Sequence, residues 1–263
     1  IEVTKIHSIS QKDDENEKII TTPPFRSPHH TSSYVSLVGG GVNLKPGEIT
    51  LSHKGILFLD EFPEIEKRSI ESLREPLEEG FISISRAKGS ERFPANFILI
   101  AALNPCPCGN LGNKDKNCIC RNIDINKYEK KLSGPIMDRI DIWVNVSNIS
   151  YSELSKKENI GEKSIVFREK INKARSIMKE RFKNTPNIEI NSEMKARDLL
   201  EFINLEDKIK KEFELYATKL KLSPRVYHKT LKVARTIADL ENKKDIELKH
   251  ILESLQYRPK IKD

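Results

Sequence analysis

Two short apolar runs stand out in a chain that is otherwise rich in charged residues. Gly55–Phe62 contains four consecutive apolar residues, and Asn96–Leu103 is apolar after its first residue. Strands that are covered on both faces are apolar throughout, so both runs predict buried strands of a parallel sheet. A third strand is expected over Ile140–Val146, where apolar and polar residues alternate.

Between the first two predicted strands, the spacing of apolar residues changes twice. Residues 66–79 repeat at helical spacing, which predicts a helix that Pro76 kinks and Gly80 ends. Residues 81–94 alternate on either side of a glycine-containing turn, which predicts a β-hairpin. Before the first predicted strand, residues 31–54 contain the turn-forming strings Gly39–Gly41 and Lys45–Gly47 and are expected to form a small hairpin insert.

Beyond about residue 150 the apolar positions recur at helical spacing only. Five helices are expected there: Ile165–Phe182, Ser192–Ile203, Glu206–Leu222, Pro224–Leu240 and Asp245–Gln256. Ser223 is a suitable N-cap for the fourth helix, and Pro224 suits its first position. The pattern therefore predicts an α/β domain over residues 1–150 and an all-helical domain over residues 151–263.

Composition narrows the class of protein. The chain has 263 residues, a net charge of +7 and a mean hydropathy of −0.54. No apolar run approaches the ~20 residues of a membrane helix, so we expect no membrane partner. The positive balance permits nucleic acid as a partner. All four cysteines fall within one short stretch rather than being spread as in a secreted disulfide scaffold, which favours a cytoplasmic location.

Two acids directly follow the first apolar run. Asp60 and Glu61 would lie at the carboxyl edge of the sheet, where open α/β sheets bind ligands. Adjacent acids at a strand end are typical of a Walker B motif, in which the first holds Mg²⁺ and the second activates water. Asn104 ends the second run, and its amide could orient that water. The alternatives are an exposed acidic turn and an ordinary strand-ending Asn-Pro.

Two arginines are candidates for contact with phosphate. Arg139 precedes the third predicted strand, and its planar set of donors suits a transition-state phosphate. A local ion pair with Asp138 or Asp141 explains it equally well. Arg225 lies at a helix N-terminus, where backbone N–H groups favour anions. A helix-surface role is the alternative for Arg225.

The cysteines and two histidines raise a separate question. Cys106, Cys108, Cys118 and Cys120 bracket one loop over residues 105–121, and four thiols can form a tetrahedral Zn²⁺ site. Redox-active thiols and plain buried residues are the alternatives. His29 and His30 lie in a proline-rich loop, where adjacent side chains are expected to point apart and so not to share one metal.

Several strings together resemble the AAA+ ATPases of the helix-2-insert clade, and within it the magnesium-chelatase-like proteins of the ComM/YifB family. They run over nearly the whole chain. The strings are Phe25–His30, Leu37–Gly40, Lys45–Glu48, Gly55–Phe62, Asn104–Gly109, Leu132–Asp141, Val233–Leu240 and Leu255–Arg258.

The resemblance implies ATP and Mg²⁺ as cofactors and a role for each candidate residue. Asp60 would be the Mg²⁺-associated acid, Glu61 the catalytic base and Asn104 sensor 1. Arg139 would be an arginine finger acting on a neighbouring subunit, and Arg225 would be sensor 2. Residues 31–54 would form the helix-2 insert, 81–94 the pre-sensor-1 hairpin and 151–263 the helical lid. On that hairpin, Arg86, Lys88 and Arg92 are expected to contact DNA phosphates.

One departure limits what the resemblance implies. The phosphate-binding string G-x-x-x-x-G-K-[ST] does not occur in the 263 residues, and neither does the family's Lon-protease-like domain. We expect a truncated AAA+ core that alone neither binds ATP tightly nor hydrolyses it.

The resemblance suggests that the full-length protein is a hexameric, ATP-hydrolysing DNA branch-migration motor or helicase of recombination and natural transformation. One alternative is a chelatase-type or protein-remodelling chaperone. Another is a non-catalytic zinc and DNA-binding module.

Overall fold

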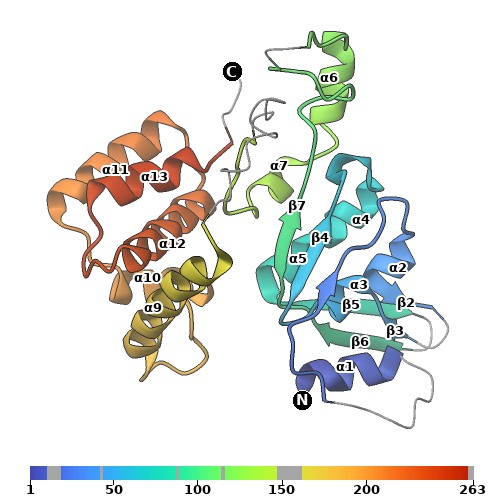
Figure 1. Ribbon diagram of the computed structural model, residues 1–263, viewed down its shortest axis with the longest axis horizontal. Coiled ribbons are helices and arrows are strands. Elements are labelled where there is room, and N and C mark those ends of the chain that lie inside the picture. Colours follow the sequence, from blue (N-terminus) through green and yellow to red (C-terminus); the bar gives the residue numbers. More distant parts are fainter. Residues whose placement is uncertain (11–18, 42–43, 87–88, 114–115, 147–161, 260–263) are drawn as a thin grey trace. The chain divides into compact units, whose positions relative to one another are not determined.

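A computed structural model describes residues 1–10, 19–41, 44–86, 89–113, 116–146 and 162–259. Its contacts divide the chain into two compact units, unit 1 over Ile1–Arg139 and unit 2 over Ile140–Asp263 (Figure 1). Unit 1 is mixed α/β with a parallel sheet, and unit 2 is helical. Both features agree with the predicted fold class. The domain boundary expected at residue 150 remains a prediction.

The sheet of unit 1 has three parallel strands in the order β1 (Phe25–Arg26), β4 (Ile56–Leu59) and β7 (Ile98–Ala101). Ile56 to Leu59 pair in register with Ile98 to Ala101. Both strands that the apolar runs predicted, and their parallel pairing, are therefore confirmed. The predicted burial on both faces is not found in β7, none of whose residues is buried. Because β4 and β7 run in the same direction, the residues that follow them emerge at the same edge of the sheet.

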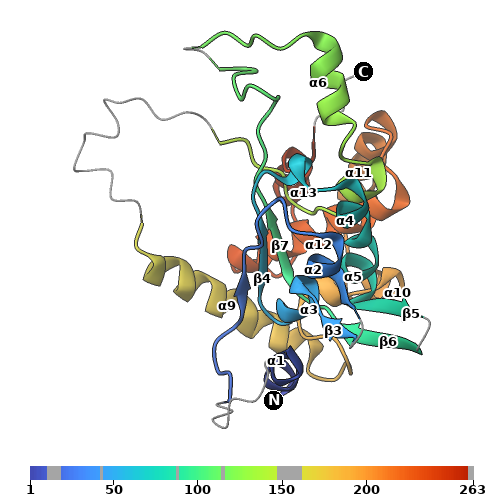
Figure 2. The ribbon, with the colours of Figure 1, turned by 90° about the vertical axis from the view of Figure 1, so that its right-hand side faces the viewer.

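The two faces of this sheet have different surroundings. Helices α2 to α5 lie on one side of β4 and β7 (Figure 2), and Leu57 and Leu59 are fully buried. Ile56 and Phe58 alternate with them and are apolar too. Their partners in the neighbouring strands, Phe25, Ile98 and Ile100, are 61%, 60% and 44% exposed. Strand β7 also pairs on one side only among the described strands. One face and one edge of the sheet are thus apolar and open in this structure.

The segment expected to form a hairpin insert is a helix–hairpin–helix. It consists of α2 (Tyr34–Val38), a two-stranded antiparallel ribbon of β2 (Gly39–Gly40) and β3 (Lys45–Pro46), and α3 (Glu48–Leu51). A Cβ atom at Gly47 would lie 2.3 Å from the backbone nitrogen of Gly39, so only glycine allows this close approach. The N-terminal helix α1 (Glu2–Ser10) packs against β3 and α3.

The helix predicted over 66–79 is divided into α4 (Lys67–Ser72) and α5 (Arg74–Glu79). Pro76 lacks the N–H that would bond back to the preceding turn, which accounts for the break near Leu73. Gly80 ends α5 in the left-handed conformation with φ 72°, as predicted. The β-hairpin follows as β5 (Phe81–Arg86) and β6 (Gly89–Pro94), which pair antiparallel.

The strand predicted over Ile140–Val146 does not form, and this prediction was wrong. These residues have no regular structure, and Ile142, Val144 and Val146 are at least half exposed. An alternating sequence becomes a strand only when another strand supplies ladder partners, and no described strand does so here. Two short helices precede this segment, α6 (Asn122–Glu129) and α7 (Gly134–Met137).

Unit 2 contains the predicted helices with small changes at their ends. They are α9 (Ser164–Phe182), α10 (Ala196–Phe202), α11 (Asp207–Lys219), α12 (Pro224–Leu240) and α13 (Leu248–Gln256), with one 3₁₀ turn, η2 (Asn191–Glu193). Ser223 caps α12 by accepting a hydrogen bond from the N–H of Val226, as expected. Leu231, Ala234 and Ala238 of α12 are buried in the core of the unit.

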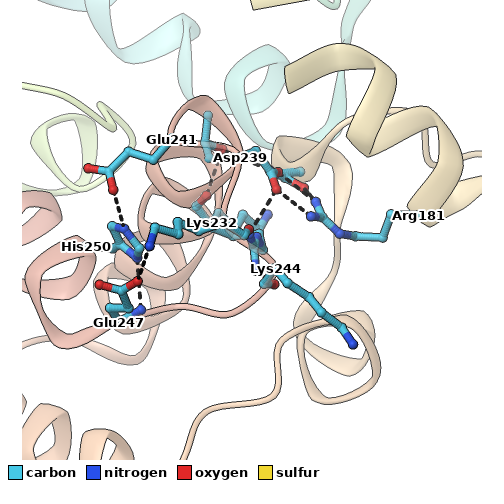
Figure 3. Close-up of polar contacts among 11 residues, drawn as sticks. Arg181, Lys232, Asp239, Glu241, Lys244, Glu247 and His250 are labelled. Carbon is cyan, nitrogen blue, oxygen red and sulfur yellow. Dashed lines mark hydrogen bonds and ion pairs between the residues drawn. The ribbon is translucent and has the colours of Figure 1, made fainter. Parts of the chain in front are cut away.

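A buried polar network crosses this helical core (Figure 3). The Asp239 carboxylate has a fully buried side chain and accepts hydrogen bonds from Arg181, with one N···O distance of 2.7 Å. Arg235 approaches the same carboxylate at 3.0 Å, and Asn191 donates to it at 2.8 Å. Desolvation lowers the pKa of Arg235, although Asp239 opposes the shift. Burying these charges is tolerable because each has a partner.

Within the described residues, no helix is both long and apolar enough to cross a membrane.

Candidate functional site

The carboxyl ends of β4 and β7 bring the two acids and the asparagine to one edge of the sheet. Asp60 and Glu61 directly follow β4, and the N–H of Phe62 donates to the carbonyl of Ala102 just after β7 (3.0 Å). Asn104 lies two residues further along. Asp60, Glu61 and Asn104 are all exposed. Exposed carboxylate and amide oxygens are suitable ligands for a hard cation such as Mg²⁺.

Glu61 has an unusual backbone and a close partner. Its φ of 49° is in the left-handed region, and its N–H bonds to the Asp60 carboxylate at 2.9 Å. His30, in the loop after β1, places Nδ1 2.7 Å from Oε2 of Glu61. Positive φ at a non-glycine residue is sparsely populated and tends to occur at functional positions.

The side chains of His29 and His30 do not point apart. Their ring centroids lie 4.2 Å from each other, so the expectation for extended chain was wrong. The loop bends at this point, because the N–H of Ser32 bonds back to the carbonyl of His29 at 2.9 Å. His29 contacts Thr31, whereas His30 reaches the candidate base.

Tyr128 on α6 ties its helix to the end of β7. Burial raises the pKa of this phenol, nearby carboxylates including Glu64 and Glu61 add to the rise, and a hydrogen bond with the backbone of Asn104 opposes it. Lys131 pairs with Glu64 at 2.8 Å. The sequence analysis missed both His30 and Tyr128 as neighbours of the site. A single aromatic residue on a short polar helix provides no signal that could have identified it.

The four candidate metal ligands come together in a group that we call the four-cysteine cluster: Cys106, Cys108, Cys118 and Cys120. All four Sγ atoms lie within 4.8 Å of one another, and no disulfide joins them. Cys106 is buried and the other three are partly exposed. Backbone N–H groups of Asn110 and then Ile119 lower the pKa of Cys108 to about 6, whereas desolvation raises that of Cys120 to about 12.

Arg139 is only 8% exposed, and it contacts its own unit. Its guanidinium forms an ion pair with Glu78 and donates to the carbonyls of Pro135 (2.8 Å) and Arg74 (3.2 Å). The sequence analysis considered a local ion pair with Asp138 or Asp141, whereas this ion pair joins Arg139 to Glu78, which lies 61 residues earlier in the chain. In this conformation the side chain holds α5 and α7 together.

The other basic candidates lie further from the strand ends along the chain. Arg225 is the second residue of α12 in unit 2 and is partly exposed. On the hairpin, Arg92 is exposed, and its guanidinium carbon lies 3.2 Å from the ring centroid of Phe81. Lys88 and the side chain of Arg86 lie outside the part of the chain that the structure describes.

Comparison with known families agrees with this arrangement of a parallel sheet and a helical unit. Residues 1–154 match the family described as magnesium chelatase, subunit ChlI, and residues 161–258 match its C-terminal region. The chain belongs to the magnesium chelatase subunit ChlI family.

Named relatives refine the family membership. The chain is 41% identical over 239 residues to the competence protein ComM of Haemophilus influenzae, covering 91% of this chain and 46% of that protein. It is 39% identical over 236 residues to YifB of Escherichia coli, covering 89% of this chain and 45% of that protein. The chain is 29% identical over 114 residues to the DNA replication licensing factor mcm2 of Schizosaccharomyces pombe, covering 43% of this chain and 12% of that protein. The chain spans about half the length of the ComM and YifB relatives.

Proposed function

We propose that this chain is part of an ATP-driven AAA+ motor. The observation that carries the proposal is the pair Asp60–Glu61 at the end of β4, beside the end of β7 that leads to Asn104. Asp60 would hold Mg²⁺, which neutralises charge on the phosphates. Glu61 would accept a proton from the attacking water, and Asn104 would orient that water. Both residues are exposed, and His30 contacts one oxygen of Glu61.

The phosphate-binding loop would come from protein outside this chain. No G-x-x-x-x-G-K-[ST] string occurs within it, and the matched relatives are about twice as long. Support comes from the open edge of β7 and the exposed apolar face with Ile98 and Ile100, which could accept one further strand and a covering helix. ATP binding and hydrolysis would then require the full-length protein, assembled as a hexameric ring in which Arg139 and Arg225 approach the phosphates.

DNA is the substrate that we propose. The similarity to a competence protein and to DNA replication licensing factors supports it, as does the net charge of +7. The hairpin would present Arg92, with Arg86 and Lys88, to the phosphate backbone. Branch migration or unwinding during recombination and transformation would be the outcome.

A second candidate function follows from the family description itself. Magnesium chelatase subunits give the family its name, so the same motor could instead remodel a protein partner during metal insertion into a porphyrin.

ATPase assays of the full-length protein with and without DNA distinguish the DNA motor from the protein-remodelling motor. The DNA proposal predicts that single- or double-stranded DNA raises the ATPase rate several-fold. It also predicts that replacing Arg86, Lys88 and Arg92 together with Ala weakens DNA binding and flattens its salt dependence. A rate that DNA leaves unchanged, with a salt dependence equal to that of wild type, would contradict the DNA proposal and favour the remodelling function.

A further inference from the structure

We infer that the four-cysteine cluster binds one Zn²⁺ ion, and that this ion anchors the loop between β7 and α6. The inference rests on the arrangement of four sulfur atoms and on the backbone that holds them. It does not depend on nucleotide hydrolysis, so it can fail or succeed independently of the proposed function.

The sulfur positions fit a tetrahedral metal. A Zn–S bond of about 2.3 Å places tetrahedral sulfurs about 3.8 Å from one another. Cys106 Sγ lies 3.4 Å from Cys108 Sγ and 3.7 Å from Cys118 Sγ, and the Cys108–Cys118 separation is 3.6 Å. The whole group stays within 4.8 Å. These separations are too long for disulfides, whose sulfurs are about 2.05 Å apart.

The backbone is shaped to present the first pair of thiolates. The N–H of Gly109 bonds to the carbonyl of Cys106 at 2.9 Å, which closes a turn with Pro107 at its second position. Gly109 has φ 75°, a conformation that side chains other than glycine rarely adopt. The N–H of Leu111 points to Cys106 Sγ at 3.3 Å. Hydrogen bonds of this kind offset the negative charge that four thiolates bring to one ion.

The chemistry of the ligands selects the metal. Four thiolates at tetrahedral separations suit zinc, whereas hard cations prefer oxygen ligands. An iron–sulfur cluster would hold the four cysteine sulfurs further apart, because inorganic atoms lie between them. On binding, each of the four thiols would lose a proton to solvent, and the metal would complete its shell with protein ligands only.

The ion would close a loop between two anchored ends. Cys106 lies two residues after Asn104, and Cys120 lies two residues before the start of α6 at Asn122. On the same helix, Tyr128 reaches back to the backbone of Asn104. Zinc would therefore hold residues 105–113 and 116–121 against the strand end that carries Asn104, as a structural site without an open coordination position.

Metal analysis of the 263-residue chain tests the inference directly. Protein purified without added zinc should carry about one zinc per chain. Replacement of a ligand, C118S or C120S, should reduce zinc content at least tenfold. The control I119S changes a side chain that is 85% exposed between these two ligands and should keep its zinc. Zinc near zero in the wild type, stoichiometric iron instead, or full zinc in C118S would overturn the inference.

A second measurement covers the case in which the cysteine variants do not fold. Chelation of wild-type zinc should expose four titratable thiols and speed tryptic cleavage after Lys116 and Arg121, both of which are exposed. Added zinc should reverse both effects, and Co²⁺ should give the intense absorption of a tetrahedral thiolate site. Four thiols that react equally fast before and after chelation, or two disulfides, would contradict the inference.

Discussion

Nδ1 of His30 lies 2.7 Å from Oε2 of Glu61, the carboxylate that we propose as the catalytic base. The contact joins the loop after β1 to the turn after β4, and it occupies an oxygen that would otherwise bind water. The proposed base is therefore engaged by its own chain in this structure.

Removing this imidazole should increase basal ATP hydrolysis by the full-length protein. The pair is partly exposed, and such pairs contribute roughly 0.2–1 kcal/mol. The H30A variant should therefore raise kcat by at most about fivefold. H30Q keeps a hydrogen-bond donor and should stay near the wild-type rate. A kcat that falls in H30A but not in H30Q would instead assign His30 to positioning the base.

Arg139 offers a test of two roles in one residue. Its ion pair with Glu78 stabilises unit 1, so R139A should lower the free energy of unfolding by about 1.5–3 kcal/mol, as expected for hydrogen bonds to a charged group. E78Q weakens the same pair and keeps the arginine. If Arg139 also acts on nucleotide, R139A should abolish hydrolysis while E78Q largely retains it.

Mixing variants tests whether Arg139 acts across a subunit interface. In a ring with head-to-tail interfaces, E61Q and R139A would damage opposite sides of each interface. In a mixture of equal amounts of the E61Q and R139A variants, about a quarter of the subunit interfaces should then have both Glu61 and Arg139 intact. Mixed samples as inactive as either variant alone would contradict an arginine finger and leave Arg139 with its structural role.

The buried carboxylate of Asp239 should dominate the stability of unit 2. It accepts from Arg181 and Asn191 and lies 3.0 Å from Arg235. Removing its charge leaves two buried guanidinium groups without compensation, so D239N should cost about 3–5 kcal/mol in denaturant unfolding. The matched change E201Q, at an exposed residue of α10, should stay within about 0.5 kcal/mol of wild type. Equal effects of the two changes would contradict this account of the network.

Glu241 should make stability depend on pH in the acid range. The Lys249 ammonium and then the His250 ring hold the pKa of Glu241 below its usual value. Because the folded-state pKa is depressed, the ionised Glu241 carboxylate contributes fully to the free energy of unfolding above about pH 4.5. That contribution is lost as the pH falls through the folded-state pKa. The difference in Tm between wild type and E241Q should therefore be largest near pH 7 and shrink toward pH 3. A difference that stays constant with pH would contradict the assignment.

The sequence predicted the elements whose pattern is local. The apolar runs identified β4 and β7, and helical periodicity placed α9 to α13, with α12 matched to the residue at both ends. Ser223 and Gly80 show why, because a cap or a left-handed turn is determined by one or two residues. The strand over Ile140–Val146 failed since strand formation depends on a partner elsewhere in the chain.

The candidate site was predictable only in part for the same reason. Parallel strands bring their carboxyl ends together, so Asp60 and Asn104 could be assigned to one edge from sequence. The four-cysteine cluster could be suspected from spacing. The contacts of His30 with Glu61 and of Arg139 with Glu78 join residues far apart in the chain. No periodicity or motif encodes such pairs, and only the folded backbone brings them into contact.

The most direct test of the account compares Mg²⁺-dependent ATP hydrolysis by the full-length protein and its E61Q variant. The glutamine keeps the shape of the side chain and removes its ability to accept a proton. ATP binding should stay within a few-fold of wild type, and kcat should fall by about 10²–10⁴, the usual contribution of a general base. An E61Q protein that hydrolyses ATP at the wild-type rate would contradict the proposal that Asp60 and Glu61 form the catalytic pair.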